Sequence, residues 1–279
     1  MRVLVTTTSQ AGHFNPLVPF VKALAARGHE LLLVVPPALE PTVRGMGHAY
    51  RLGAPPSPEV AAIWERVPSL PPGEAAVLIN REIFGRLSTV ALLPAVEKAC
   101  SDRRPDLVLR EPCEYAGAVV AARTGIRQAQ VAISQARIEA SALDLVGPAL
   151  EPHGPDLLET IRQAPYLTRF PASLDPSPFK DTRRFREETE SPQDPLPDWW
   201  IGGDGPLVYV TLGTVAGELP IAAAAYRAAL AAVAPLAVRV LVTVGRSFEV
   251  RSLGAIPDNV HVEPWVPQER VLGDAAVVV

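Results

Sequence analysis

The sequence predicts an α/β protein with two Rossmann-like domains, each built on a parallel sheet, the second of them incomplete. Short apolar runs rich in Val and Leu alternate with helical spacings along the chain, which is typical of parallel strands and crossover helices. A stretch rich in acidic residues, Pro and Gly at 187–206 interrupts this series, and the pattern then restarts. We therefore predict domains at 1–195 and 206–279, joined by a linker at 196–205.

The first β-α-β unit is predicted at the N-terminus. Residues 2–7 form a short β-branched run that is expected to be a buried strand. Asn15 is a suitable N-cap for the helix that follows, Pro16 fits its first position, and Gly28 fits its end. A strand over 30–35 completes the unit, which should be parallel and right-handed.

The remaining elements follow from the same patterns. In the first half we expect, in order, a Pro-rich loop or irregular helices at 53–80, a helix at 83–100, a strand at 106–109, a helix at 115–123, a strand at 128–133 and irregular helices at 138–165. In the second half we expect a strand at 207–211, a helix at 220–234, strands at 238–244 and near Val260, and a final strand at 274–279.

Composition narrows the class of protein. The net charge of −4 and the lack of Lys/Arg clusters argue against nucleic acid as a partner. The N-terminus lacks the features of a signal peptide, and no apolar stretch reaches the ~18–20 residues of a membrane span, so a cytoplasmic protein is expected. Cys100 and Cys113 have no CxxC or Cys/His neighbour, and both are predicted to be buried thiols rather than disulfide partners or metal ligands.

Two polar residues follow separate predicted strands of the first half. His13 lies in the loop after the first strand, and Glu111 comes just after the strand at 106–109. Ligands bind outside the carboxyl ends of parallel strands, so the two side chains should meet there if the strands are neighbours. A carboxylate on one imidazole nitrogen fixes the tautomer and stabilises the imidazolium. We predict that the pair deprotonates a hydroxyl, and that the positive end of the following helix favours the neutral imidazole.

Other interpretations of these residues stay open at this point. A loop histidine is more often a structural hydrogen-bonding residue than a base, and Glu111 fits equally well as a cap for the next helix. Glu114 is a rival for the role of either residue, and Phe14 and Glu114 are candidates to contact a bound molecule. The other histidines are predicted to be structural or exposed: His29, His48, His153 and His261.

The second half carries small and aromatic residues after its strands. Small residues at 211–214 would let backbone N–H groups approach a phosphate, and Trp265 offers an indole face for stacking on a nucleobase. The candidate nucleotide-binding residues are Gly213, Thr214, Gly245, Arg246, Trp265, Val266 and Gln268. The first loop is not GxGxxG, and the sequence has no GxxxxGK[ST] and no Asp-x-Asp pair, so neither a dinucleotide cofactor nor a bound metal is predicted.

The order of these motifs resembles that of a known family. Residues 11–16 (AGHFNP), with an amphipathic helix ending at 27–29, resemble the N-terminus of bacterial nucleotide-sugar glycosyltransferases of the antibiotic and macrolide type, which are related to UDP-glycosyltransferases. Residues 105–112 resemble the acceptor-domain motif of these enzymes, and 208–214 with 264–268 resemble the start of their donor domain. The resemblance spans the whole chain.

The resemblance implies the GT-B architecture, in which the first domain binds the acceptor and the second binds the nucleotide sugar. It implies inverting transfer, without metal or cofactor, from a dTDP- or UDP-linked sugar to a hydroxyl of a natural-product acceptor. By position, His13 would be the base and Glu111 the carboxylate that orients it, where the family more often has Asp. Thr214 would lie near the diphosphate, and Trp265 and Gln268 near the base and ribose.

Further expectations concern the acceptor and the assembly. The acceptor is expected to be apolar and bulky, and residues 53–80 and 138–165 are candidates to form its pocket. A homodimer is a possible assembly.

The last strand carries one more expectation. In the family, a strand such as 274–279 leads into a His-Gly-Gly-x-Gly-Thr loop and a helix whose N-terminus holds the diphosphate, and that loop is absent here. We therefore expect transfer by these residues alone to be impaired. Two alternatives are a non-catalytic truncated remnant or acceptor-binding module, and a nucleotide-sugar epimerase of similar architecture.

Overall fold

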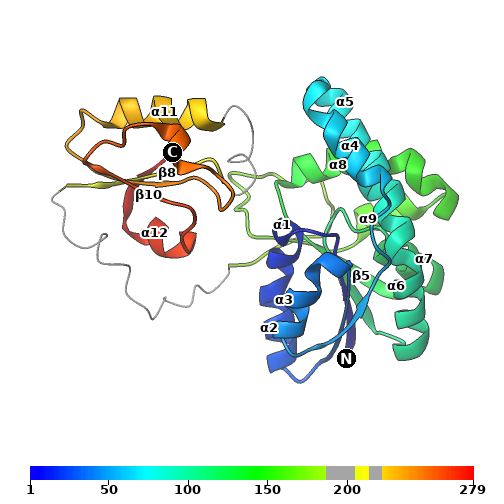
Figure 1. Ribbon diagram of the computed structural model, residues 1–279. Coiled ribbons are helices and arrows are strands. Elements are labelled where there is room, and N and C mark those ends of the chain that lie inside the picture. The colour runs from blue at the N-terminus through cyan, green and yellow to red at the C-terminus, as the bar shows by residue number, and fades with distance from the viewer. Residues whose placement is uncertain (187–204, 214–221) are drawn as a thin grey trace. The chain divides into compact units, whose positions relative to one another are not determined.

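The computed structural model describes residues 1–186, 205–213 and 222–279 (Figure 1). The chain divides into two compact units, Met1–Glu188 and Thr189–Val279. The predicted domain boundary and all of the predicted linker except Gly205 lie outside the described residues. Among the helices that are described, none is long and apolar enough to cross a membrane.

The first unit is built on a parallel sheet that, over the described residues, has the strand order β3-β2-β1-β4-β5-β6-β7. Its strands are β1 (Arg2–Thr6), β2 (Glu30–Val35), β3 (Ala49–Leu52), β4 (Leu107–Arg110), β5 (Arg127–Val131), β6 (Tyr166–Thr168) and β7 (Thr182–Arg184). The chain runs outward from β1 to β3 and then returns to place β4 on the other side of β1. The strand order therefore reverses between β1 and β4, which is the point where ligands of open α/β sheets bind.

Helices cover both faces of this sheet (Figure 1). They are α1 (Ala11–Phe14), α2 (Val18–Ala26), α3 (Glu40–Gly45), α4 (Glu59–Arg66), α5 (Pro72–Val77), α6 (Thr89–Arg103), α7 (Ala116–Thr124), α8 (Ala136–Leu150) and α9 (Leu157–Gln163). Short turns of 3₁₀-helix occur at η1 (Asn15–Leu17), η2 (Pro37–Leu39), η3 (Val67–Ser69) and η5 (Glu151–His153). A π-helical segment, η4 (Leu78–Ser88), joins α5 to α6, so that one helical rod runs from residue 72 to residue 103.

The two faces of the sheet follow from the alternation of side chains along each strand. Val3 and Val5 of β1 point to the core shared with α2 and α3. Leu4 between them points to the opposite core, which contains residues of α6 and α7. Because both faces are buried, the strand reads as the continuous apolar run seen in the sequence.

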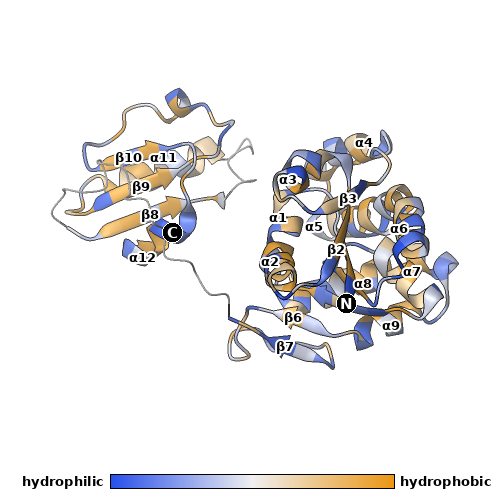
Figure 2. Cartoon of the chain, turned by 90° about the horizontal axis from the view of Figure 1, so that it is seen from below, coloured by the Kyte–Doolittle hydropathy of each residue, from blue (hydrophilic) through white to orange (hydrophobic). Residues whose placement is uncertain are grey.

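The second unit repeats the architecture on a smaller scale. Its parallel sheet has the order β10-β9-β8-β11 across the residues that the structure describes. The elements are β8 (Leu207–Thr211), α11 (Ala222–Val233), β9 (Arg239–Thr243), η7 (Val250–Leu253), β10 (Val260–Glu263), α12 (Gln268–Asp274) and β11 (Ala275–Val278). Tyr226 and Leu230 of α11 cover one face, and Val271 of α12 covers the other. The strands β8 and β9 are coloured as hydrophobic in Figure 2, as expected for strands buried on both faces.

The structure corrects several sequence-based boundaries. Asn15 is not an N-cap, because it has helical φ and ψ angles and a helical path already begins at Ala11. The strand predicted at 106–109 is observed as β4 at 107–110, so Arg110 is its last residue and not the first residue after it. Three strands, β3, β6 and β7, and the helices α3 and α12 were not predicted. Both irregular helical regions, 53–80 and 138–165, do contain helices.

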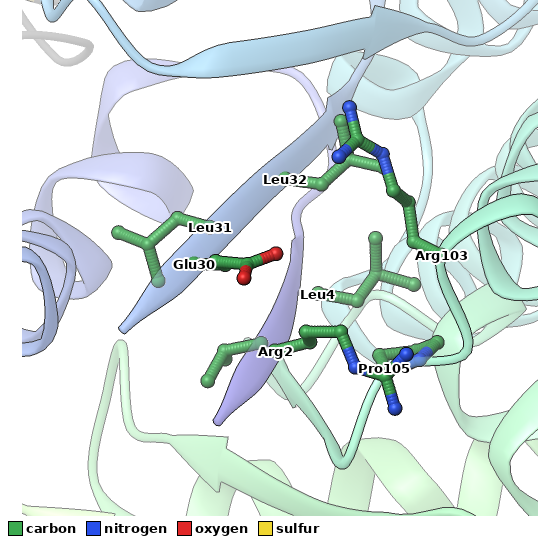
Figure 3. A pocket seen from close by; sticks show the side chains of 8 residues that line it. Arg2, Leu4, Glu30, Leu31, Leu32, Arg103 and Pro105 are labelled. Carbon is green, nitrogen blue, oxygen red and sulfur yellow. The ribbon is translucent and has the colours of Figure 1, made fainter. Parts of the chain in front are cut away.

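A small cavity lies at the amino ends of the strands of the first sheet, where β1 and β2 begin (Figure 3). Arg2, Glu30 and Arg103 contribute polar side chains to it, and Leu4, Leu32 and Pro105 contribute apolar ones. It lies at the amino ends of the strands, so it is remote from the edge at which parallel sheets bind their ligands.

Candidate active site

The candidate site lies where β1 and β4 end side by side. The two strands pair in parallel with Thr6 opposite Arg110, so the loops that follow them leave the sheet next to each other. Those loops carry His13 and Glu111, whose predicted contact is confirmed: His13 Nδ1 lies 3.3 Å from Glu111 Oε1. Their catalytic roles remain a prediction.

Glu111 is fully buried and is held by donors from both loops. The backbone N–H and the hydroxyl of Thr8 both donate to Oε1, at 3.0 and 2.7 Å. The backbone N–H of Cys113 donates to Oε2 at 2.6 Å. A buried carboxylate with three donors has a fixed orientation, so Glu111 is a rigid partner for the imidazole.

The imidazole of His13 presents Nδ1 to Glu111 and lies beside the ring of Phe84, with 5.3 Å between the ring centroids. Nδ1 is buried and, within the described residues, accepts or donates no well-aligned hydrogen bond despite its closeness to Glu111. Catalytic hydrogen bonds are often poorly aligned before substrate binds. With Nδ1 towards the carboxylate, Nε2 is the nitrogen left to accept a proton from a substrate.

The pKa of His13 shifts in the direction opposite to the prediction. Burial lowers the pKa of His13, but the adjacent Glu111 carboxylate, with a smaller effect of Glu139, outweighs burial and raises the pKa above 6.5. Burial raises the pKa of Glu111, but His13 and the donors of Thr8 outweigh it and lower the pKa from 4.5. The predicted lowering of the His13 pKa is wrong, because the effects of the Glu111 carboxylate outweigh those that lower it.

Gln10 has an unusual backbone conformation next to this pair. Its φ is +116°, which a residue with a side chain rarely adopts. Its carbonyl accepts the backbone N–H groups of His13 and Phe14, at 3.1 and 3.2 Å. Such a conformation stores about 1–3 kcal/mol of strain and is maintained only by the structure around it. The start of α1, and with it the position of His13, is therefore held under strain.

Arg110 is a fully buried residue whose importance the sequence did not reveal. Its Nη1 donates to the carbonyls of Glu111 and Glu114 at 3.1 and 3.2 Å. Nε donates to Gln128 Oε1 at 2.9 Å, and Nη2 donates to Gln130 Oε1 at 3.3 Å. The guanidinium thus ties the 111–114 loop to β5, and burial lowers its pKa from the usual value. The only sequence signal was a charged residue at the end of an apolar strand.

Glu114 and Phe14, the two predicted acceptor-contact residues, are both buried. The Glu114 carboxylate accepts the Thr6 hydroxyl and the backbone N–H of Gly117 in the first turn of α7, so the helix-capping alternative considered for Glu111 applies to Glu114. Glu114 is also among the residues that line the cavity described below. Phe14 is 0% exposed and packs in the core with α2, which corrects its predicted role because it offers no surface to an acceptor.

Glu139 of α8 is a second carboxylate near the pair that the sequence did not single out. The N–H groups of Ile133 and Ser134 donate to its Oε1 at 2.8 and 2.6 Å, and the Tyr166 hydroxyl donates to Oε2 at 2.6 Å. Burial raises the pKa of Glu139 from 4.5 to about 7, more than these donors lower it, and the nearby Glu111 charge adds to the rise.

The Glu139→Gln variant is expected to lose part of the pH dependence of stability. The folded-state pKa of Glu139, about 7, lies above its unfolded value of 4.5, so this group stabilises the fold fully below pH 4.5 and loses that contribution as the pH rises through 7. Glutamine cannot ionise. Relative to the unmodified protein, its free energy of unfolding should therefore gain about 1–3 kcal/mol between pH 5 and pH 8. Urea denaturation at both pH values measures these free energies of unfolding. An equal change between pH 5 and pH 8 in the two proteins would contradict the prediction.

An apolar cavity opens at the same edge of the first sheet. Its empty volume is about 610 Å³, part of it open to solvent. The residues that line it are Thr7, Thr8, Ser9, Pro36, Ala38, Ala54, Pro56, Val60, Leu87, Ser88, Thr89, Ala91, Leu92, Glu114 and Tyr115. The predicted 53–80 region thus contributes to this cavity, whereas 138–165 does not. Thr8 connects the cavity to the His13–Glu111 pair, because it lines the cavity and its hydroxyl donates to Glu111.

The two candidate glycines of the second unit lie at the carboxyl ends of its strands. Gly213 and Gly245 follow the paired strands β8 and β9, have φ values of +77° and +95°, and have open space where a Cβ would stand. The Gly213 N–H donates to Thr211 Oγ1 at 3.1 Å, and the Gly245 N–H donates to the Pro264 carbonyl at 3.0 Å. Thr214 lies outside the described residues.

The aromatic part of this group is partly exposed. Trp265 is 46% exposed, and the guanidinium of Arg246 lies over its ring, 4.7 Å from the centroid. Val266 packs against the core beneath α12, and exposed Gln268 is the first residue of that helix. One indole face is therefore covered by a cation, and a stacking base must use the other face or displace Arg246.

Comparison with known proteins confirms the resemblance predicted from the sequence. No protein-family model matches the chain. The chain is 29% identical, over 94% of its own length and 69% of its relative's, to the L-demethylnoviosyl transferase of Streptomyces niveus. It spans about two thirds of the length of the curated relatives that it matches over most of its own length.

Solved structures share the fold. The glycosyltransferase SnogD of Streptomyces nogalater matches all of the chain with a TM-score of 0.75 at 23% identity, and the chain covers 75% of SnogD. SsfS6 from a Streptomyces species, solved with thymidine diphosphate, matches all of the chain with a TM-score of 0.72 at 24% identity, and the chain covers 75% of it. The predicted two-domain architecture with parallel sheets is thereby confirmed as that of these glycosyltransferases.

Proposed function

Because its sequence and fold resemble those of glycosyltransferases of antibiotic biosynthesis, we propose that the whole protein transfers a sugar from a nucleotide diphosphate to a natural-product acceptor. The sugar donor is dTDP- or UDP-linked, and the acceptor group is a hydroxyl. The transfer inverts the anomeric configuration and uses no metal. The absence of an Asp-x-Asp pair from the sequence supports the metal-free proposal.

The observation that carries this proposal is the His13–Glu111 pair beside the apolar cavity. His13 Nε2 accepts the proton of the acceptor hydroxyl, and the oxygen attacks the anomeric carbon. The bond from that carbon to the diphosphate breaks, and its electron pair leaves with the diphosphate. Glu111, ionised and held by Thr8 and Cys113, stabilises the imidazolium that forms.

The acceptor proposed for this site is bulky and apolar. The cavity reaches the Thr7–Ser9 loop, which precedes the helix that carries His13, and most of its lining side chains are apolar. A hydroxyl on the edge of a hydrophobic skeleton can therefore approach the base while the skeleton fills the cavity.

On the donor side, the diphosphate binds at residues 211–214 and the nucleobase stacks on Trp265. The open positions at Gly213 and Gly245 allow close approach of a phosphate or sugar. Thymidine diphosphate is the ligand in the SsfS6 structure, which favours a dTDP-linked donor for this chain.

The test incubates the whole protein with dTDP- and UDP-linked hexoses and a set of apolar, hydroxylated polyketides. The expected products are free nucleoside diphosphate and an acceptor heavier by one sugar. NMR should show that the anomeric configuration of the transferred sugar is inverted, and EDTA should not change the rate of transfer. A retained configuration or loss of turnover in EDTA would contradict the proposed mechanism. Isomerisation of the nucleotide sugar without any acceptor product would support the epimerase alternative instead.

A further inference from the structure

Cys113 brings a thiol to the His13–Glu111 pair. One ligand atom from each of the three residues lies within 4.8 Å of the others, and both Glu111 and Cys113 are buried. The sequence predicted Cys113 to be an isolated thiol, because His13 is far away along the chain. The pairing of β1 with β4 brings the two loops together.

This set of atoms has the chemistry of a site for a thiophilic cation. Imidazole, thiolate and carboxylate are the ligands of Zn²⁺, whereas Mg²⁺ and Ca²⁺ prefer oxygen alone. With metal–ligand bonds of about 2.0–2.3 Å, a tetrahedral ion keeps its ligand atoms roughly 3.3–3.7 Å apart. His13 Nδ1 and Glu111 Oε1 are already 3.3 Å apart, and the three ligand atoms of the cluster all lie within 4.8 Å of one another.

One atom of the set makes no well-aligned hydrogen bond. His13 Nδ1 is buried and, across the described parts of the chain, makes no hydrogen bond. A buried nitrogen whose contact with its neighbour, the Glu111 carboxylate at 3.3 Å, is poorly aligned for a hydrogen bond is a natural position for a metal–ligand bond. The side chain of His13 is 13% exposed, so solvent and ions reach this edge of the cluster.

The anchoring of the cluster favours binding with little rearrangement. Glu111 is fixed by Thr8 and by the backbone of Cys113 itself, and the 111–114 loop is tied to β5 by Arg110. The outer partners that hold a ligand in its binding orientation are thus already present. Three protein ligands would leave the fourth position to water.

We propose that His13, Glu111 and Cys113 form a binding site for one Zn²⁺ or Co²⁺ ion, and that an ion bound there blocks the base. The ion bonds to Nδ1 in place of a proton and separates the imidazole from the Glu111 carboxylate. The thiol of Cys113 loses its proton to solvent as the metal–sulfur bond forms. The charge of the ion then opposes formation of the imidazolium on which proton transfer from an acceptor depends.

Cobalt titration of the untagged, metal-free protein tests this directly. We expect one equivalent of Co²⁺ to give the intense visible bands of a tetrahedral site together with a thiolate-to-cobalt charge-transfer band. Cys113→Ala should abolish the charge-transfer band, and His13→Ala should weaken binding at least tenfold. Cys100→Ala is the matched control, since Cys100 is also a buried thiol but lies in a separate core with α6 residues, and it should leave the spectrum unchanged.

The absence of a charge-transfer band, its survival in Cys113→Ala, or its loss in Cys100→Ala would each overturn the proposed site. Calorimetry with Mg²⁺ should show no binding to the cluster, and tight Mg²⁺ binding that requires His13 would contradict the thiophilic character. The blocking of the base rests on the proposed function and has its own readout, inhibition of transfer by Zn²⁺ that EDTA reverses. Cobalt binding without any transferase activity of the whole protein would uphold the site and refute the function.

Discussion

Replacing His13 by alanine is expected to lower kcat for glycosyl transfer in the whole protein by about 10²–10⁴-fold. The reason is that, among the described residues, Glu111 and Glu114 at this edge are already held by hydrogen bonds and do not replace Nε2 as the proton acceptor. The fold should persist, because Glu111 retains its hydrogen bonds to Thr8 and Cys113 without the imidazole. Release of nucleoside diphosphate in single-turnover experiments measures the chemical step, and circular dichroism reports the fold.

A matched control separates the base from a general effect of losing a histidine. His48 lies in the turn before β3, away from the ends of β1 and β4, and His48→Ala should retain full activity. Affinity for the nucleotide sugar, measured by calorimetry, should not change in His13→Ala, because the proposed donor residues belong to the second unit. A His13→Ala protein whose kcat stays within about tenfold of the unmodified protein would rule His13 out as the base.

Glu111→Ala and Glu111→Gln are expected to differ in what they damage. Alanine leaves three buried donors of Thr8 and Cys113 without an acceptor, so the free energy of unfolding should fall by about 3–5 kcal/mol. Glutamine keeps an oxygen for Thr8 but removes the charge that stabilises the imidazolium. We expect this variant to fold and to lose about 10²-fold or more in kcat with little change in KM. Urea denaturation and steady-state kinetics provide the two measurements.

Glu114→Gln is the natural comparison for these variants. Glu114 is as buried as Glu111 and lies on the same loop, but its carboxylate contacts Thr6 and Gly117 rather than His13. The Glu114→Gln variant should lose stability but should not show the loss in kcat expected for Glu111→Gln. An equal loss in kcat for Glu114→Gln and Glu111→Gln would show that the loop, and not the Glu111 charge, is what the reaction requires.

The central strands and the central contact were predictable because they follow from strong local signals. Apolar runs at β1 and β4 identified the strands, and the rule that ligands bind at the carboxyl ends of parallel strands brought His13 and Glu111 together. The rule applies only if the two strands are neighbours in the sheet, and β1 and β4 are paired directly. The amphipathic helix before Gly28 was equally clear.

The remaining features depended on tertiary contacts that the sequence does not display. Strand β7 is short and polar, so its residue types do not indicate a strand. It forms because its backbone pairs with β6. Arg110 is compatible with burial only because Gln128 and two loop carbonyls surround it. Phe14 follows His13 directly, yet the helical turn that starts at Ala11 directs it into the core. In each case the environment, formed by distant residues, decided the outcome.

The central position of β1 has a consequence for how the protein is made. This strand leaves the ribosome before its partner β4, which lies about 100 residues later, a delay of roughly 5–20 s at ~5–20 residues per second. During that interval Leu4 and Val34 lack the cover of α6 and α7, and one edge of β1 has unpaired backbone groups. The nascent chain therefore exposes an incomplete sheet with apolar side chains and an unpaired strand edge. Chaperones that bind exposed apolar strands should bind it before residue 110 emerges.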